Sequence, residues 1–346
     1  MKSERSVRII LIGIGNLGRR FAQVITDRHD ELLSRYALDI RIVAAADSRG
    51  AAINPRGLDG HAIANLKLES QSIGELPEFG YPGMTGLQLI EAVEADILCE
   101  AGPVNLDAGG EPALSHVCRS LEKGMHVSTP NKGPIVLAYR KLKALAQAHN
   151  VQLRFDGTVA GGLPAIALAS RDLRGATIQR IESVPNLTTG YVLDRLAAGI
   201  TWDDAVEEAR QAGALEGDGA WDLDGWDAAA KITILALSVL NVDINLSDVL
   251  RKGVRDIDLA WLKTESKKGL VRLVASAIRQ SDGSYQLDVV PIVLPHEHPL
   301  GKLTDQQMGI TIETDLFGTI TSVITEETPL PSASTMLRDL LDIYCA

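Results

Sequence analysis

The sequence predicts an α/β protein with two domains, a doubly wound parallel sheet followed by an α+β domain whose sheet is mainly antiparallel. First, 346 residues exceed the length that a single hydrophobic core serves. Second, short apolar runs alternate with helix-like stretches up to about residue 155, which is typical of a parallel sheet covered by helices. Third, strand-like runs follow one another after residue 270, which indicates an antiparallel sheet.

The expected elements follow from the apolar pattern. In the first domain, residues 1–155, strands are predicted at 7–12, 40–45, 96–99, 126–128 and 151–155, and helices at 17–27, 86–94, 112–123 and 135–150. In the second domain, residues 156–325, helices are predicted at 202–211 and 227–240, and strands at 271–279, 285–293, 309–314 and 318–324. A last amphipathic helix is predicted at 334–345.

The composition excludes several classes of protein. The 45 acidic and 34 basic residues give a net charge of −11, which disfavours nucleic acid and anionic membranes as partners. The cysteines Cys99, Cys118 and Cys345 show no disulfide or metal-binding spacing, as expected in the cytoplasm. The longest uncharged apolar stretch, residues 232–240, is far shorter than the ~20 residues of a membrane span. We therefore expect a cytoplasmic protein that acts on a small molecule.

A glycine motif lies where the first predicted strand meets the first helix. Residues 13–18 read Gly-Ile-Gly-Asn-Leu-Gly, which matches the G-x-G-x-x-G of dinucleotide-binding turns. Glycines also occur where a helix merely packs on a strand, but the flanking strand and helix, and Asp47 behind the next strand, favour a Rossmann-type nucleotide site. There a pyrophosphate is bound by free N–H groups at the helix N-terminus. The expected cofactor contacts are Gly13, Gly15, Asn16, Leu17 and Gly18.

Residues 47–49 give opposing indications about the cofactor. The Asp47 carboxylate can accept hydrogen bonds from ribose hydroxyls, which favours NAD. Ser48 and Arg49 can instead bind the 2′-phosphate of NADP. A third interpretation is that the three residues form only a polar turn. The sequence therefore predicts NAD(P) without choosing between its two forms.

A lysine follows the strand predicted at residues 126–128. The segment 128–134 reads Ser-Thr-Pro-Asn-Lys-Gly-Pro and connects this strand to a helix. Loops at the carboxyl ends of parallel strands bind ligands in doubly wound folds, so Lys132 is placed to polarise or protonate a carbonyl beside a nicotinamide. The alternative is an ordinary solvated lysine.

An acidic cluster surrounds a second lysine, Lys231. Asp227 and Lys231 are four residues apart, so they share one face of the predicted helix. Their pairing can be an exposed surface contact, but the uncharged run that follows indicates a buried helix. The further carboxylates nearby in sequence are Glu216, Asp222 and Asp224. Carboxylates around one amine suit proton transfer or recognition of a substrate ammonium group.

Taken together, these motifs resemble the homoserine dehydrogenases, in the short form that lacks a C-terminal regulatory domain. The resemblance covers nearly the whole chain. Its motifs are residues 13–18, Gly109-Gly110-Glu111-Pro112, Asn131-Lys132-Gly133-Pro134, residues 157–164, residues 213–231 and His298-Pro299-Leu300. It implies NAD(P)-dependent interconversion of aspartate 4-semialdehyde and homoserine, a step in threonine and methionine biosynthesis. It also implies a homodimer, and a C-terminal segment, residues 326–346, that packs on the first domain.

The resemblance also implies roles for individual residues. The implied catalytic residues are Lys132, Lys231 and Asp227. The two lysines converge beside the nicotinamide with Lys231 as proton donor, and Asp227 binds the substrate amino group or holds a bridging water. The implied substrate contacts are Glu216, Asp222 and Thr188, and the further cofactor contacts are Ala101, Gly102, Pro130, Lys132 and Gly213. A monovalent cation is implied as a second cofactor, bound by backbone oxygens of Asp156, Val159, Gly161 and Leu163.

Two segments depart from the pattern of the family. Residues 186–190 read Asn-Leu-Thr-Thr-Gly where the family has Asn-Gly-Thr-Thr-Asn. Residues 328–332 read Thr-Pro-Leu-Pro-Ser where the family has a glycine-rich loop. Both changes imply a stiffer and more apolar pocket. Two alternative functions follow: a paralogous dehydrogenase that acts on a less polar hydroxy or carbonyl compound, and a cofactor-binding regulator without turnover.

Overall fold

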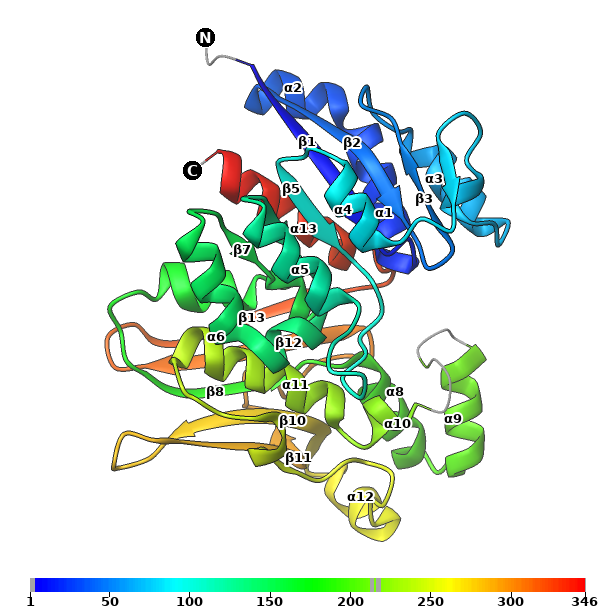
Figure 1. Ribbon diagram of the computed structural model, residues 1–346. Helices are drawn as coiled ribbons and strands as arrows, with labels where there is room; N and C mark the ends of the chain where they lie inside the picture. Colours follow the sequence, from blue (N-terminus) through cyan, green and yellow to red (C-terminus); the bar gives the residue numbers. More distant parts are fainter. Residues whose placement is uncertain (1–3, 212–214, 216–218, 346) are drawn as a thin grey trace. The chain divides into compact units, whose positions relative to one another are not determined.

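The computed structural model describes residues 4–211, 215 and 219–345, and the chain divides into two units. The first unit comprises Met1–Gly162 together with Thr328–Ala346, and the second comprises Leu163–Glu327. Each unit contains one sheet with its own helices, which are labelled in Figure 1. The C-terminal segment therefore belongs to the first unit.

The first unit is built on a seven-stranded sheet with the order β4-β3-β2-β1-β5-β6-β7. Strands β1, β2, β5, β6 and β7 run parallel, and β3 and β4 form an antiparallel edge. The strands are β1 (Arg5–Ile12), β2 (Leu38–Ala46), β3 (Gly50–Ile53), β4 (Gly80–Pro82), β5 (Ile97–Glu100), β6 (His126–Ser128) and β7 (Leu153–Arg154). The helices are α1 (Asn16–Asp27), α2 (His29–Tyr36), α3 (Gly60–Leu68), α4 (Gly86–Ala92), α5 (Ala113–Glu122), α6 (Lys132–Ala148) and α13 (Leu330–Tyr344), with short 3₁₀ turns η1 (Ile73–Glu75) and η2 (Asp156–Thr158).

The core of the first unit forms around β1. Val7, Ile9 and Leu11 occupy alternate positions of this strand and are fully buried on one face of the sheet. Helices α1 and α13 pack against that face, α13 being the red helix of Figure 1; their buried contacts are Phe21, Ile25, Met336, Leu340 and Ile343. Each large apolar side chain buried in this way contributes about 1.5–3 kcal/mol. Helix α13 is thus part of this core, although the whole second unit precedes it in the sequence.

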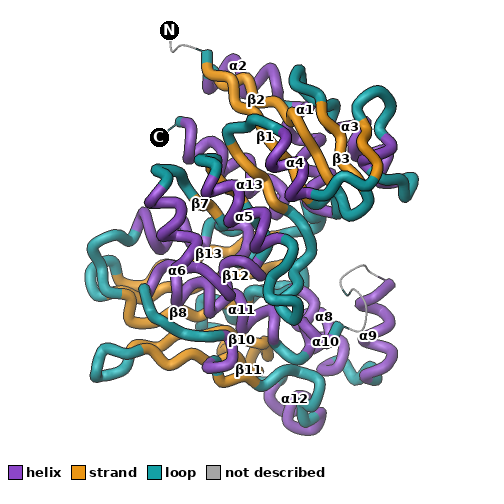
Figure 2. Tube along the Cα trace, viewed as in Figure 1, coloured by secondary structure: helices purple, strands orange, loops and turns teal. Residues whose placement is uncertain are grey.

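The second unit is built on a six-stranded sheet with the order β13-β12-β8-β10-β11-β9, whose strands are orange in Figure 2. All its pairings are antiparallel except that of β11 with β9. The strands are β8 (Ile178–Val184), β9 (Leu250–Arg251), β10 (Gly269–Arg279), β11 (Tyr285–Pro295), β12 (Gln307–Thr314) and β13 (Gly318–Thr325). The helices are α7 (Ala165–Ala167), α8 (Leu187–Ala197), α9 (Trp202–Gln211), α10 (Ala220–Leu223), α11 (Trp226–Leu235) and α12 (Leu259–Glu265), with short turns η3 (Leu168–Asp172), η4 (Ala236–Leu240) and η5 (Leu246–Asp248). The two sheets confirm the predicted fold class.

Several elements escaped prediction from the sequence. The central strand β8 contains Arg180 and Glu182, which interrupt its apolar pattern. Their charges compensate each other in the fold, because Arg180 Nη2 lies 2.5 Å from Glu182 Oε1 and His298 Nε2 lies 3.1 Å from Glu182 Oε2. In the first unit α2, α3, β3 and β4 were not predicted, because their apolar runs are short.

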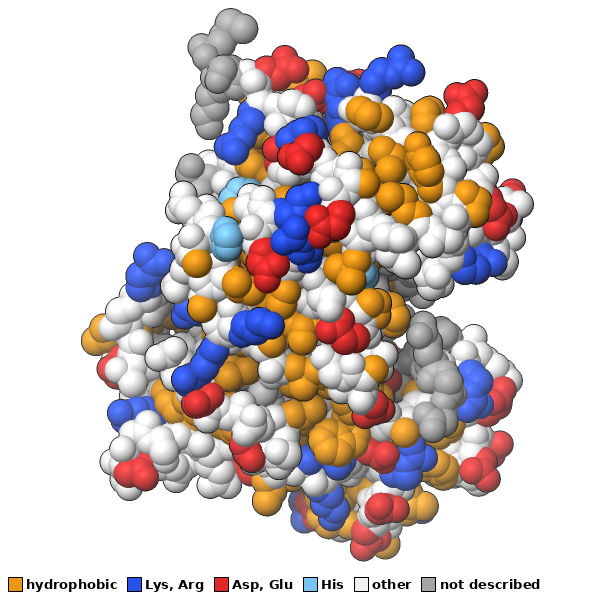
Figure 3. Space-filling view, viewed as in Figure 1, with side chains coloured by type: hydrophobic (Ala, Val, Ile, Leu, Met, Phe, Trp, Pro, Cys, Tyr) orange, Lys and Arg blue, Asp and Glu red, His pale blue; other side chains and the backbone are white. Residues whose placement is uncertain are grey.

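Charged side chains of both signs are interspersed on the faces of the units that Figure 3 shows. Over the part of the chain that the structure describes, no helix combines the length and the hydropathy needed to cross a bilayer.

Candidate active site

The glycine turn between β1 and α1 is shaped by close backbone contacts. A Cβ on Gly13, whose φ is +89°, would lie 2.2 Å from the backbone nitrogen of Gly102. A Cβ on Gly18 would lie 2.0 Å from the carbonyl oxygen of Gly13. At Gly15, by contrast, no atom lies within 4 Å of an added Cβ. Gly13 and Gly18 therefore make the turn tight, and Gly15 leaves an open approach to the backbone.

The N-terminus of α1 is open for an anion. Its N-cap residue is Gly15, which offers no side-chain cap, and its first turn contains no acidic residue. The exposed Asn16 accepts hydrogen bonds through Oδ1 from Arg19 Nη2 at 2.7 Å and from Arg20 Nη1 at 3.2 Å. Two guanidinium groups therefore add positive charge beside the uncapped helix end. These residues fit the pyrophosphate of a dinucleotide.

This turn lies at the switch point of the sheet. Strand β1 pairs in parallel with β2 on one side and with β5 on the other. The Ala101 N–H donates to the Ile12 carbonyl oxygen at 2.7 Å, which joins the loop after β5 to the end of β1. In open α/β sheets, ligands bind outside the carboxyl ends of the strands at this point. The fold therefore brings Gly13, Ala101 and Gly102 together where a nucleotide is expected. We call this part of the first unit, together with the N-terminus of α1, the nucleotide edge.

The loop between β6 and α6 is hydrogen-bonded to the nucleotide edge. Asn131 caps α6 by accepting from the Gly133 N–H at 3.0 Å, and its amide donates to the carbonyl oxygens of Gly102 and Pro103 at 3.2 and 3.1 Å. Pro130 is buried, and the half-buried Lys132 is the first residue of α6. The predicted lysine thus follows directly on a loop bonded to the nucleotide edge.

The carboxylate of Asp47 accepts several hydrogen bonds within the first unit. Its side chain is 7% exposed, and its carboxylate accepts from Lys67 Nζ (2.6 Å), the Arg49 N–H (2.8 Å), Ser72 Oγ (3.0 Å), the Ile73 N–H (3.0 Å) and the Gly50 N–H (3.1 Å). Burial raises the pKa of Asp47, but the bonds from Lys67 and the backbone outweigh it and leave the pKa below its ordinary value. A carboxylate has about four lone-pair sites, so the turn already uses its acceptor capacity. Ser48 and Arg49 are the exposed residues of this turn.

The second unit gathers the other predicted lysine and its carboxylates. Lys231 Nζ lies 2.7 Å from Asp227 Oδ2 and donates to the Pro185 carbonyl oxygen at 2.6 Å. The side chains of Lys231 and Asp227 are only 12% and 8% exposed, so the interpretation as an exposed surface pair is wrong. The amide of Asn186 donates to Asp222 Oδ1 at 2.6 Å and to Asp227 Oδ2 at 2.9 Å. Three elements, α8, α10 and α11, thus supply one buried network of charges.

Asn186 belongs to this network, and the sequence analysis did not name it as a site residue. It is the N-cap of α8, and its Oδ1 accepts from the Thr189 N–H at 3.0 Å. Capping fixes the side chain, and its remaining amide hydrogens join the two carboxylates. The available signal was an asparagine directly before the helix, and Thr188, which follows it, is also buried.

Other predicted residues lie elsewhere or outside the described part. Asp224 does not join the Lys231 network, because its Oδ1 accepts from Arg255 Nε at 2.8 Å, so its expected place around that lysine was wrong. Gly213 and Glu216 lie outside the described residues.

The loop expected to bind a monovalent cation contains a different positive charge. Asp156 Oδ2 lies 2.7 Å from Arg338 Nη2, and Arg338 Nη1 donates to the Gly162 carbonyl oxygen at 3.0 Å. Within residues 4–211, 215 and 219–345, no group of three His, Cys, Asp or Glu side chains is placed to bind a metal ion. A guanidinium thus already neutralises the carboxylate of this loop, and a cation on the backbone oxygens of the loop would lie close to a like charge.

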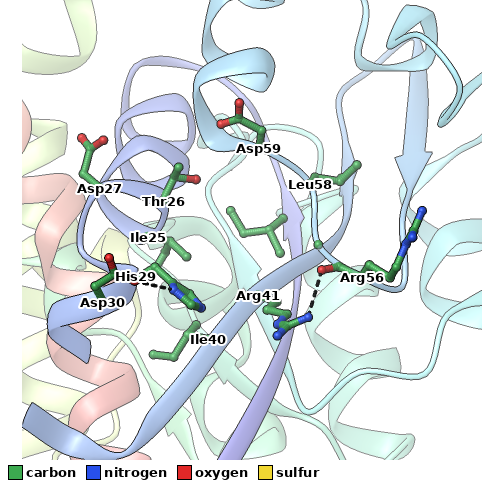
Figure 4. A pocket seen from close by; sticks show the side chains of 12 residues that line it. Ile25, Thr26, Asp27, His29, Asp30, Ile40, Arg41, Arg56, Leu58 and Asp59 are labelled. Carbon is green, nitrogen blue, oxygen red and sulfur yellow. Dashed lines mark hydrogen bonds and ion pairs between the residues drawn. The ribbon is translucent and has the colours of Figure 1, made fainter. Parts of the chain in front are cut away.

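A separate polar hollow of about 500 Å³ lies in the first unit near the C-terminal end of α1 (Figure 4). Two of its charged lining residues, His29 and Arg41, contact the same carboxylate. His29 Nε2 lies 3.0 Å from Asp39 Oδ1, and Arg41 Nε donates to the same oxygen at 2.9 Å. Because α1 begins at the glycine turn and ends here, this hollow is distinct from the nucleotide edge.

Comparison with known proteins decides the family. Residues 13–156 match the family model described as homoserine dehydrogenase, NAD binding domain, and residues 164–341 match the model described as homoserine dehydrogenase. The chain belongs to the homoserine dehydrogenase family. This result confirms the resemblance that the motifs indicated, and it confirms an NAD(P)-binding domain that includes the glycine turn.

Named relatives of this homoserine dehydrogenase family member cover nearly its whole length. A homoserine dehydrogenase of Methanocaldococcus jannaschii is 35% identical over 97% of this chain and 98% of its own. An NAD(+)-dependent homoserine dehydrogenase of Pseudomonas canavaninivorans is 32% identical over 97% of this chain and 96% of its own. Among solved structures, a hyperthermophilic archaeal homoserine dehydrogenase in complex with NADPH is similar, with a TM-score of 0.85, 26% identity, and coverage of 99% of this chain and 98% of that chain.

Proposed function

We propose that this chain is an NAD(P)-dependent homoserine dehydrogenase, which interconverts aspartate 4-semialdehyde and homoserine by hydride transfer. The buried ammonium–carboxylate network around Lys231 carries the proposal. The same chain also has, in its first unit, a nucleotide edge that is bounded by glycines and includes an uncapped helix N-terminus. The relatives named homoserine dehydrogenase, one NAD(+)-dependent and one solved with NADPH, support it.

Lys231 is the proposed proton donor to the aldehyde oxygen. When bound, the nicotinamide supplies the hydride to the carbonyl carbon, and the alkoxide oxygen then requires one proton. Asp227 and the Pro185 carbonyl oxygen hold the Lys231 Nζ in place, so that its remaining hydrogen can be directed at a ligand. In the reverse direction the same amine accepts the proton of the hydroxyl group. Asp227 acts as the positioning partner of Lys231.

The remaining residues are proposed to bind and orient. Lys132, which follows the loop bonded to Gly102, is assigned to the carbonyl end of the substrate beside the nicotinamide. Asp222, Glu216 and Thr188 are assigned to the substrate amino group and its surroundings. A carboxylate already oriented by Asn186, as Asp222 is, suits recognition of an ammonium group.

The assembly and location of the enzyme are also proposals. We propose a homodimer, supported by the exposed apolar side chains of Leu316, Phe317 and Val323 on the β12–β13 hairpin, where β13 is an edge strand. The three cysteines are free thiols, which supports a reducing compartment such as the cytoplasm.

A cofactor-linked assay tests the proposed activity. The purified full chain is mixed with L-homoserine and either NAD or NADP, and the absorbance of the reduced cofactor is followed. We expect turnover, and we expect Lys231→Met to lower kcat by about 10²–10⁴-fold, the range typical of general acid–base catalysis. The dissociation constant of the reduced cofactor, measured by fluorescence titration, is expected to stay unchanged, because Lys231 lies in the other unit from the glycine turn.

The matched control is Lys263→Met, which removes an exposed lysine of α12 in the same unit. It is expected to retain the full rate. A near-normal rate in Lys231→Met contradicts the assigned role. Tight cofactor binding without turnover of homoserine contradicts the proposed substrate and favours a dehydrogenase for another hydroxy compound or a regulator.

A further inference from the structure

The C-terminal helix of the first unit supplies an arginine to the loop that follows β7. Arg338 of α13 donates through Nη1 to the Gly162 carbonyl oxygen at 3.0 Å and through Nη2 to Asp156 Oδ2 at 2.7 Å. The Asp156 side chain is only 8% exposed, so this carboxylate needs a compensating charge. The two planar N–H donors of one guanidinium therefore join the start and the end of the same loop.

The backbone of the loop is arranged around this contact. Residues Asp156–Thr158 form a 3₁₀ turn, closed by Thr158 Oγ1 donating to the Phe155 carbonyl oxygen at 2.6 Å. Ala160 and Gly161 then have φ values of +52° and +58°, two successive left-handed residues that reverse the chain. The reversal lets the Gly162 carbonyl oxygen and the Asp156 carboxylate accept from the same side chain. Val159 and Ala160 are fully buried, so the loop is anchored in this shape.

A guanidinium in this position provides what a bound monovalent cation would provide. It neutralises a buried carboxylate and attracts a backbone oxygen, and it keeps its charge throughout the accessible pH range. A Na⁺ or K⁺ ion on the backbone oxygens of the same loop would be repelled by the nearby guanidinium charge.

We propose that the Arg338 guanidinium replaces a monovalent cation in the Asp156–Gly162 loop, so that the stability of this chain does not depend on Na⁺ or K⁺. Arg338 is here a positioning residue, which fixes the loop that leads out of the first unit. The proposal does not rest on the proposed activity, because it concerns the loop in the folded chain without substrate.

Thermal unfolding of the full chain in different salts tests the proposal. The Tm is measured in NaCl, KCl and choline chloride at equal ionic strength, over a range of concentrations. A specifically bound ion raises the Tm in proportion to the logarithm of its concentration once this exceeds the dissociation constant, whereas general screening does not distinguish the three cations. We expect the three Tm curves to coincide. A rise of several °C in NaCl or KCl alone, growing with the logarithm of the salt concentration, would overturn the proposal.

Variants at Arg338 provide the second arm. Arg338→Ala leaves Asp156 without its cation, so we expect a Tm lower by a few °C in choline chloride and a partial recovery specific to NaCl or KCl. Arg338→Lys keeps one charge and is expected to remain indifferent to the cation. Arg35→Ala, which removes an exposed arginine of α2 in the same unit, is the matched control and is expected to show neither effect.

The remaining outcomes are decisive as well. An Arg338→Ala variant with the wild-type Tm in all three salts would overturn the proposal, because the guanidinium would then not be needed in the loop. If Arg338→Ala does not fold, the wild-type salt series and Arg338→Lys still decide. Binding of ²³Na⁺ to the wild-type chain, detected as line broadening that K⁺ reverses, would also overturn it.

Discussion

The two units present their functional groups in different ways. The nucleotide edge of the first unit is built from backbone: Gly13, Gly18 and Gly102 lie in direct backbone contact, and α1 begins without a cap. The network of the second unit is built from side chains, with Asn186, Asp222, Asp227 and Lys231 supplied by three helices. A backbone edge depends on neighbours in sequence, whereas a side-chain network depends on how distant helices pack.

The two regions also differ in charge. The helix end and two guanidinium groups make the nucleotide edge positive, as an anionic dinucleotide requires. Among the described residues, the network of the second unit brings the carboxylates of Asp222 and Asp227 together, which suits recognition of a ligand that carries an ammonium group. Each region is thus complementary to a different part of the proposed reaction.

The backbone construction of the nucleotide edge predicts the largest effects for substitution of its glycines. In Gly13→Ala, the new Cβ meets the Gly102 backbone, and the positive φ is strained for alanine. We expect a loss of about 2–5 kcal/mol in the free energy of unfolding, measured in urea, because strain and overpacking add. We expect NADH affinity to fall by about 100-fold or more, since a shift of the turn misplaces the N–H donors.

Gly15→Ala is the matched control at the neighbouring glycine. Its Cβ meets no atom within 4 Å, and its φ of −86° is allowed for alanine, so stability is expected to change by about 1 kcal/mol or less. NADH affinity is nevertheless expected to fall by about 10-fold, because the methyl group obstructs the approach to the helix end. Equal loss of stability in the two variants would contradict the division between packing and binding glycines.

The same contrast explains what could be predicted from the sequence. The strand, the glycine turn and the helix at residues 7–27 are contiguous, so their pattern was sufficient to predict a nucleotide site. The pairing of Asp227 with Lys231 was predictable because it obeys the helical i,i+4 spacing. The roles of Asn186 and Arg338 were not, since each depends on a contact across many residues. The bonds of Asp47 to Lys67 and Ser72 were not predictable either, because they depend on the long connection between β3 and β4, where the sequence predicted no element.

Removal of Asn186 tests the side-chain network at the residue that joins its carboxylates. In Asn186→Ala, Asp222 and Asp227 each lose a hydrogen-bond donor, and α8 loses its cap. We expect the free energy of unfolding to fall by about 1–3 kcal/mol, the typical cost of buried polar groups left without a partner. Urea denaturation monitored by circular dichroism measures this change.

Asn245→Ala is the control for this substitution. Asn245 is also an asparagine that precedes a helical turn and donates to an aspartate, Asp248, at 3.1 Å, but it is exposed. Water can replace its bonds, so we expect a loss of about 0.5 kcal/mol or less. Losses of similar size at the two positions would contradict the importance assigned to burial in the network.

The first unit offers a buried carboxylate to compare with Asp227. Asp339 of α13 is fully buried and accepts from Ser128 Oγ at 2.7 Å, whereas Asp227 has an ammonium partner. Burial raises the pKa of Asp339 to about 7, although the hydrogen bond from Ser128 lowers this pKa. Among the charged neighbours, Asp156 raises this pKa further, and Arg338 and Arg154 lower it.

This raised pKa predicts a loss of stability as the pH increases. The unfolded chain releases the Asp339 proton near pH 3.8, but the folded chain keeps it until about pH 7, so unfolding releases a proton between these values. Stability is therefore expected to fall across this window by at most about 1.4 kcal/mol per pH unit and to level off above it. Asp339→Asn stays neutral at every pH, so its Tm relative to that of the wild type is expected to rise from pH 5 to about pH 7 and then to level off. Parallel Tm curves for the two proteins over this range would show that Asp339 is already ionised in the folded state at pH 5.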